Sequence, residues 1–116
     1  MRWGVICLAG FLLWTRSATG LAFPVAETFT FGGEIRNYLV YRPAGLDQAK
    51  PVPLLMVLHG SAGSGEDMVR ITEQGFEKIA EKEKFIVVYP DAMERRWNDH
   101  GDGVDDAGFC FPSSIN

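Results

Sequence analysis

The chain has 116 residues, a length typical of one domain at most. A composition of 47% hydrophobic and 22% charged residues is that of a globular protein and excludes a disordered one. The formal net charge of −4, with no basic patch, argues against a nucleic-acid partner.

Residues 1–22 have the order of parts that is typical of a secretory signal peptide. Arg2 supplies a positive charge, residues 3–15 form an uncharged apolar run, and small residues surround Gly20 and Ala22. The apolar run is short for a bilayer span, and a retained membrane anchor is the alternative reading. Cleavage after Gly20 or after Ala22 satisfies the small-residue rule. We expect a secreted protein, extracellular or periplasmic, that contacts the membrane only through this peptide.

The segment after the signal peptide predicts an antiparallel hairpin. Polar and aromatic residues alternate over 28–31, and β-branched and aromatic residues dominate 35–41. Gly32 and Gly33 between them can adopt the positive φ of a tight turn. Residues 44–53, rich in Gly, Pro and Asp, predict a loop after the second strand.

Two short apolar runs, 54–58 and 85–89, predict buried strands on either side of a helical pattern. Ser64 with an acid three residues later indicates a helix start, and Gly75 should divide the pattern into two short helices. A strand, helices and a strand in this order predict a parallel βαβ unit. The expected fold class is therefore α/β, an edge hairpin plus a βαβ unit. Beyond Pro90 the periodicity disappears, and we expect irregular structure there.

The stretch "LLMVLHGSAGSGEDM" joins the first buried strand to the helical pattern through a glycine-rich turn. Gly60 and Gly65 have the spacing of a phosphate-binding loop, but Glu66 and Asp67 follow where that motif needs Lys and Ser or Thr. Two carboxylates there would repel a triphosphate, so we expect no nucleotide partner.

The alternative is a loop that binds an oxyanion. In α/β-hydrolases the loop after the third strand, often beginning His-Gly, donates a backbone N–H to the tetrahedral intermediate. His59 is expected to stabilise the turn through its ring, and Gly60 lets the backbone approach a carbonyl. The N–H of Ser61 is the first candidate donor and that of Ala62 the second. A plain turn without this role is the other reading.

Four segments carry a family resemblance: "RNYLVYRPAGLD", "PVPLLMVLHGSAGSGEDM", "GFEKIAEKEKFIVVYPDA" and "GVDDAGF". Over residues 29–109 the chain resembles the secreted polyhydroxybutyrate depolymerase and feruloyl-esterase-like group of α/β-hydrolases. The resemblance implies a serine esterase without a cofactor. Its substrates would be hydroxyalkanoate polyesters, feruloyl or acetyl-xylan-type esters of plant polysaccharides, or related acyl esters. It also places Trp97 and Asn98 near the acyl pocket, although a tryptophan is more often a core residue.

The chain departs from this family in what it lacks. No G-x-S-x-G elbow occurs in it, so no catalytic Ser, Asp or His is assigned. Residues 23–109 are then the N-terminal part of an α/β-hydrolase domain with an incomplete sheet, and 110–116 a divergent tail. Cys110 imitates the nucleophile position of an elbow but has no preceding strand, so we dismiss it. We expect a truncated chain that is inactive alone; the alternative is a non-catalytic secreted fragment or binding protein.

The acidic stretch "NDHGDGVDD" has partial calcium-loop spacing, but His100 is a poor ligand for a hard cation and Phe109 stands where Glu is needed. We therefore predict no metal site. Asp105 and Asp106 are expected to cap a helix. In an incomplete sheet we expect uncovered apolar faces and poor folding, with this set of side chains exposed: Leu55, Val57, Ile86 and Val88.

Overall fold

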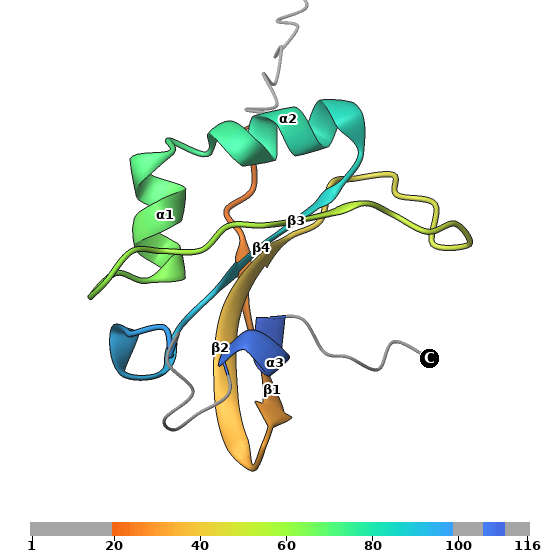
Figure 1. The fold of residues 1–116 in the computed structure, drawn as a ribbon. Coiled ribbons are helices and arrows are strands. Elements are labelled where there is room, and N and C mark those ends of the chain that lie inside the picture. The colour runs from red at the N-terminus through yellow and green to blue at the C-terminus, as the bar shows by residue number, and fades with distance from the viewer. Residues whose placement is uncertain (1–19, 99–105, 111–116) are drawn as a thin grey trace, which may run out of the picture.

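The computed structural model describes residues 20–98 and 106–110 (Figure 1). The predicted signal peptide up to residue 19, His100, Asp105 and residues 111–116 of the predicted tail lie outside the described residues. Within the described ranges, no helix has the length and apolar character needed to cross a membrane.

The protein is a small mixed α/β domain built on one four-stranded sheet with the order β1-β2-β4-β3. β2 pairs antiparallel with both β1 and β4, and β3 pairs parallel with β4. The predicted hairpin and the predicted parallel pair are therefore both present, and β4 joins them. The strands have these bounds: β1 Val25–Phe31, β2 Glu34–Tyr41, β3 Leu54–Met56 and β4 Ile86–Pro90.

The hairpin turn follows from its two glycines. Gly32 and Gly33 have φ values of 61° and 84°, which is the left-handed backbone that a two-residue turn of this kind requires. β1 begins at Val25, ahead of the alternating stretch that predicted it. β3 is shorter than the predicted run, although the Val57 N–H still donates to the carbonyl of Val88 at 2.9 Å.

Two helices connect β3 to β4, α1 Gly65–Ile71 and α2 Gly75–Glu83. The predicted break between them is confirmed, and it lies just before the glycine. Glu73 and Gln74 adopt φ values of 52° and 55°, and α2 then begins at Gly75. These left-handed residues turn the chain, so that α2 runs at a steep angle to α1 rather than continuing it (Figure 1).

The core lies between the sheet and α1 and α2. Val69 and Ala80 from the helices meet Val87 and Tyr89 from β4, and all four side chains are fully buried. The prediction that Leu55 and Val57 stay uncovered is wrong. Val57 is only 8% exposed and Leu55 packs against this cluster, because successive strand residues alternate between the faces and the helices cover theirs.

The opposite face of the sheet is covered at the hairpin. After Pro90 the described residues up to 98 are mainly irregular, as predicted, apart from a 3₁₀ turn η1, Met93–Arg95. The helix expected at Asp105 and Asp106 is present as α3, Asp106–Cys110. Phe109 of α3 stacks on Phe29 of β1 at 5.2 Å. The Arg36 guanidinium lies 4.1 Å from the Phe109 ring centroid.

Asp106 is the first residue of α3, and its carboxylate binds residues from other parts of the chain. One oxygen pairs with the buried guanidinium of Arg36 on β2, and the other accepts the Asn98 N–H at 2.7 Å. α3 is therefore held by a partner 70 residues away. A helix of five residues has no hydrophobic periodicity to predict it, and the signal for it in the sequence is the acidic residue at its start.

Candidate functional site

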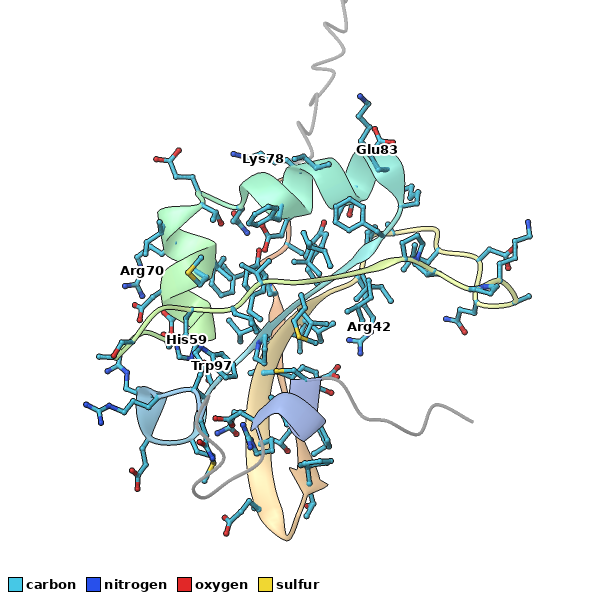
Figure 2. All side chains as sticks on the ribbon, in the orientation of Figure 1. Arg42, His59, Arg70, Lys78, Glu83 and Trp97 are labelled. Atoms are coloured by element: carbon cyan, nitrogen blue, oxygen red, sulfur yellow. The ribbon has the colours of Figure 1, made fainter. Side chains whose placement is uncertain are left out.

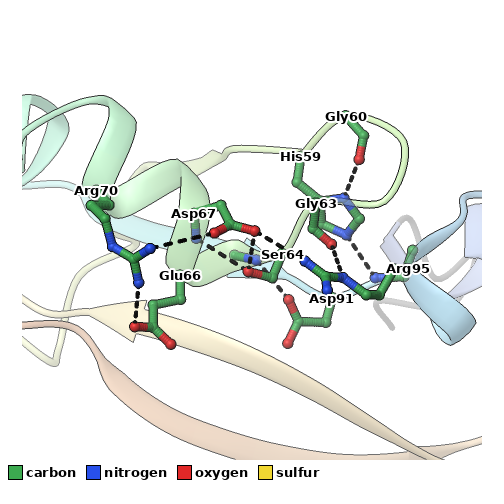
Figure 3. Close-up of polar contacts among 11 residues, drawn as sticks. His59, Gly60, Gly63, Ser64, Glu66, Asp67, Arg70, Asp91 and Arg95 are labelled. Carbon is green, nitrogen blue, oxygen red and sulfur yellow. Dashed lines mark hydrogen bonds and ion pairs between the residues drawn. The ribbon is translucent and has the colours of Figure 1, made fainter.

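The glycine-rich loop lies at the carboxyl end of β3, where it leads into α1. In open α/β sheets, ligands bind beyond the carboxyl ends of the parallel strands. The segment that follows β4 emerges at the same edge and contacts the loop, as Figure 3 shows for Asp91 and Arg95. The site therefore has two parts, the loop before α1 and the turn after β4.

Gly65 allows α1 to begin directly against β4. A Cβ at this position would lie 2.7 Å from the Tyr89 carbonyl oxygen and 3.0 Å from the Tyr89 Cβ, closer than van der Waals contact permits. The Gly65 N–H donates to the Asp91 carboxylate at 2.6 Å (Figure 3). Gly65 is thus fixed by its close approach to Tyr89 and by its hydrogen bond to Asp91, and these two contacts determine where the loop ends and α1 begins.

Ser64 is the N-cap of α1, as the sequence predicts. Its hydroxyl oxygen accepts the Asp67 N–H at 3.2 Å, and the hydroxyl donates to the Asp67 carboxylate at 2.8 Å. This hydroxyl, followed by the charges of Arg95 and Arg70, lowers the pKa of Asp67 below its ordinary value. The carboxylate is therefore an ionised anchor at the helix start.

His59 stabilises the turn and is not a free base. The Ala92 N–H donates to its Nε2 at 3.1 Å, so Nε2 carries no proton. The proton then lies on Nδ1, which donates to the Gly60 carbonyl at 2.7 Å. With the residue 4% exposed and both ring nitrogens engaged, the imidazole connects the loop to the turn after β4.

Trp97 lies against His59, as Figure 2 shows. The ring centroids are 4.8 Å apart, and the indole Nε1–H donates to the His59 carbonyl at 2.8 Å. This half-buried tryptophan therefore orients the backbone of the loop. Asn98, the other residue expected near an acyl group, donates its backbone N–H to Asp106 and so contacts α3.

The N–H groups of the loop divide into engaged and free donors. The Ala62 N–H donates to the Arg95 carbonyl at 2.9 Å, and the Gly63 N–H to the Gly60 carbonyl at 3.0 Å. Within residues 20–98 and 106–110, the N–H groups of Gly60 and Ser61 make no hydrogen bond, and both residues are exposed. The Ser61 N–H is thus a free donor. The residue before it is held through the Gly60 carbonyl, and the residue after it through the Ala62 N–H.

The loop and the turn after β4 contact each other through residues with unusual backbone angles. In the loop, φ is 60° at Ala62, and in the turn it is 50° at Glu94 and 61° at Arg95. Residues other than glycine rarely adopt this region. Arg95 also reaches the loop with its side chain. Its Nε–H donates to the Gly63 carbonyl at 3.2 Å, and its Nη2 lies 3.3 Å from the Asp67 carboxylate (Figure 3).

Two hollows adjoin these elements. A polar pocket of about 400 Å³ lies between the loop, β2 and the turn after β4; its lining residues are Asn37, Gly63, Ser64, Asp91, Ala92, Glu94 and Arg95. A smaller apolar pocket of about 90 Å³ lies on the α3 face; its lining residues are Phe29, Tyr38, Met56, Val88, Pro90, Phe109 and Cys110.

Cys110 is not placed as a nucleophile. It is buried at the end of α3, and burial followed by the charge of Asp106 raises the pKa of its thiol. A nucleophilic cysteine needs a lowered pKa and an accessible sulfur. The structure therefore agrees with dismissing the sequence around Cys110 as a nucleophile elbow.

Sequence reasoning missed Asp91, Ala92 and Arg95 as residues that hold the loop. Ala92 acts through its N–H and Arg95 partly through its carbonyl, and backbone groups leave no signal in residue type. Asp91, directly after a strand, was the detectable one, because polar residues at the carboxyl ends of parallel strands meet at the ligand-binding edge.

Comparison with known proteins finds no family model and no curated protein that matches this sequence.

Proposed function

We propose that the loop between β3 and α1 is the oxyanion-binding loop of a secreted carboxylic-ester hydrolase with an α/β-hydrolase fold. The observation that supports this most is the N–H of the exposed residue Ser61, which makes no hydrogen bond within the described part of the chain, in a loop held on both sides. The loop follows the third strand and opens with His59-Gly60, the position from which α/β-hydrolases supply an oxyanion donor.

The chemistry that suits this donor is attack on an ester. When a nucleophile adds to the carbonyl carbon, the carbonyl oxygen becomes an anion that fixed N–H groups stabilise. One such donor lowers the barrier by about 3–4 kcal/mol because it is already oriented when the charge develops. Since the Ala62 N–H is engaged with Arg95, Ser61 is the principal donor in this proposal and Gly60 the second.

The remaining parts of such an enzyme are a nucleophile, its base and an acid. The printed sequence contains no G-x-S-x-G elbow, and both ring nitrogens of His59 are engaged in hydrogen bonds. We therefore propose that these parts come from polypeptide outside the 116 residues. The chain alone then has a site for the developing charge and no group that generates it.

The substrate class follows from the resemblance to depolymerases of hydroxyalkanoate polyesters and to feruloyl or acetyl-xylan esterases. We propose that the acyl group rests against the exposed part of Trp97, because this ring is fixed to the loop through the His59 carbonyl. A phosphate ligand is disfavoured, since Glu66 and Asp67 open α1 and the nearby Arg70 and Arg95 are paired with them.

The first test is an assay of the purified chain on p-nitrophenyl acetate. The expected result is no turnover above the buffer rate, because no nucleophile is paired with a base in the part of the chain that the structure describes. Turnover that disappears in Ser61→Ala or Cys110→Ala would show a nucleophile within the chain and contradict the proposal.

The donor is tested in the reading frame extended beyond residue 116. Ser61→Pro removes the N–H, and Ser61→Ala keeps it while removing the hydroxyl. We expect kcat to fall about 100- to 1,000-fold in the proline variant and to change little in the alanine variant. An equal loss in both variants would instead identify the hydroxyl as the important group. A thermal melt of each variant controls for unfolding, and the absence of turnover in the extended wild type would favour a binding protein.

A further inference from the structure

The turn after β4 is built around one residue, Arg95, that contacts the loop through both backbone and side chain. Its carbonyl accepts the Ala62 N–H at 2.9 Å. Its Nε–H donates to the carbonyl of Gly63, the next residue of the loop, at 3.2 Å. These two bonds hold Ala62 and Gly63, the residues that follow Ser61. The Gly63 N–H in turn donates at 3.0 Å to the Gly60 carbonyl, which lies in the same peptide plane as the Ser61 N–H, so Arg95 restricts that plane through Gly63.

The same side chain also connects the loop to the start of α1. Its Nη2 lies 3.3 Å from the Asp67 carboxylate, which already binds the hydroxyl of the N-cap Ser64 (Figure 3). Arg70 approaches the same carboxylate at 3.7 Å but makes no contact with the loop backbone. Of the two arginines, only Arg95 bridges the loop and the helix.

The backbone of the turn after β4 adopts an unfavourable conformation that directs Arg95 toward the loop. Glu94 and Arg95 are consecutive left-handed residues, and the Arg95 N–H donates to the Ala92 carbonyl at 3.1 Å. Ala92 in turn donates to His59. A non-glycine residue in this region costs on the order of 1 kcal/mol, so such a turn persists only where its surroundings fix it.

We propose that Arg95 is a positioning residue that orients the Ser61 N–H through Ala62 and Gly63. This inference rests on the proposed function for the role of that N–H. The guanidinium is largely exposed, so its ion pair with Asp67 adds little to global stability. Its effect should therefore be local to residues 60–64.

The test is amide hydrogen exchange and the ¹H–¹⁵N spectrum of the 116-residue chain, with Arg95→Gly as the main variant. Glycine keeps the left-handed turn and its carbonyl and removes the guanidinium. We expect exchange at Ala62 and Gly63 to accelerate about 3- to 10-fold, the effect of losing one ordinary hydrogen bond from an exposed side chain. The Ser61 amide resonance should shift, while exchange at Val87 and Tyr89 in β4 stays within about 2-fold, because their protection tracks global opening.

Two further variants separate positioning from general stabilisation. Arg70→Ala removes the other arginine at Asp67 and should leave the Ser61 resonance and loop exchange unchanged. Arg95→Lys keeps a charge near Asp67 but cannot donate to two partners in a fixed geometry, so we expect it to restore only part of the protection. Unchanged loop exchange in Arg95→Gly, or equal acceleration in Arg70→Ala, would overturn the inference.

If Arg95→Gly lowers protection throughout β4 as well, the residue is a general stabiliser and the inference is also overturned. None of these measurements requires ester hydrolysis. A failure of the proposed esterase would leave the exchange result intact, and a failure of the exchange result would leave the esterase assay to be judged by itself.

Discussion

At the scale of single residues, the loop is defined by close approach and by engaged donors. Gly65 lies where the α1 backbone meets the β4 backbone, and His59 uses both ring nitrogens on neighbouring peptide groups. Residue type predicted these features to different extents. The His-Gly pair and the Ser64 cap have recognisable signals, but the Arg95 carbonyl that engages Ala62 has none.

Gly65→Ala should destabilise the protein, because its Cβ would lie 2.7 Å from the Tyr89 carbonyl oxygen. Relief of that overlap requires a shift of α1 or β4, and overpacking of this kind costs about 1–3 kcal/mol. Gly60→Ala is the matched control, since a Cβ there meets nothing within 4 Å. Urea unfolding measures both. A loss of stability for Gly60→Ala equal to that for Gly65→Ala would show that crowding against Tyr89 is not the cause.

At the scale of elements, two tyrosine–glutamate hydrogen bonds connect α2 to the sheet. The Tyr41 hydroxyl donates to Glu81, and the Tyr89 hydroxyl donates to the fully buried Glu77, both at 2.5 Å. The glutamates lie four residues apart on α2, so both face the sheet. The alternating charges of residues 77–84, "EKIAEKEK", are typical of a solvated helical face, and this pattern does not show that Glu77 and Glu81 contact the sheet.

These pairs should make the fold sensitive to alkaline pH. Burial, followed by the hydrogen bond to Glu81, raises the pKa of Tyr41 from 10.0 to about 12. The raised pKa means that the folded state holds the phenolic proton more tightly than the unfolded chain does. The stabilisation is complete below about pH 10 and is lost as the pH rises toward 12. Tyr89 shifts in the same direction, again mainly through burial.

The free energy of unfolding, measured by urea titration between pH 9 and pH 12, should therefore decrease above pH 10. One tyrosine contributes at most about 1.4 kcal/mol per pH unit to this slope. Tyr41→Phe removes the titrating group and should make the slope shallower while Tyr89 keeps part of it. An identical pH dependence in wild type and Tyr41→Phe would exclude this pair as a source.

The elements also show where prediction from sequence ends. The hairpin, the parallel pair and the helix break were predicted because turn glycines and apolar runs are local signals. The position of β4 between β2 and β3, and the short helix α3, depend on contacts between distant residues. For the site, the loop was identified together with His59 and Ser64, which hold it from within, whereas the residues after β4 that hold it from outside were not.

At the scale of the whole molecule, the two faces of the sheet differ. α1 and α2 cover one face, and α3 covers the other only at the hairpin (Figure 1). Leu54 of β3 is 56% exposed, and among the described strands β3 has a neighbour on one side only. This arrangement fits a partial α/β fold. The segment after β4 is held to the hairpin by the buried pair Arg36–Asp106.

Removing only one charge of the Arg36–Asp106 pair should strongly lower the free energy of unfolding. Asp106→Asn leaves the Arg36 charge buried without its counterion, and two of the Arg36 nitrogens already have no hydrogen-bond partner among the described residues. We expect a loss of about 3–5 kcal/mol in urea unfolding. The double variant Arg36→Met with Asp106→Leu replaces both charges and should be near wild type, since buried pairs are often replaceable by apolar groups. Equal destabilisation in both variants would show that the ion pair itself is not what matters.

The most direct test of the central claim, that this loop belongs to an ester hydrolase, is to sequence the DNA that follows the codon for Asn116. The expected result, in one of the three frames and within about 150–200 residues, is a G-x-S-x-G elbow followed by an Asp or Glu and then a His. If no frame encodes these residues in this order, the loop has no nucleophile to serve, and the esterase account is contradicted.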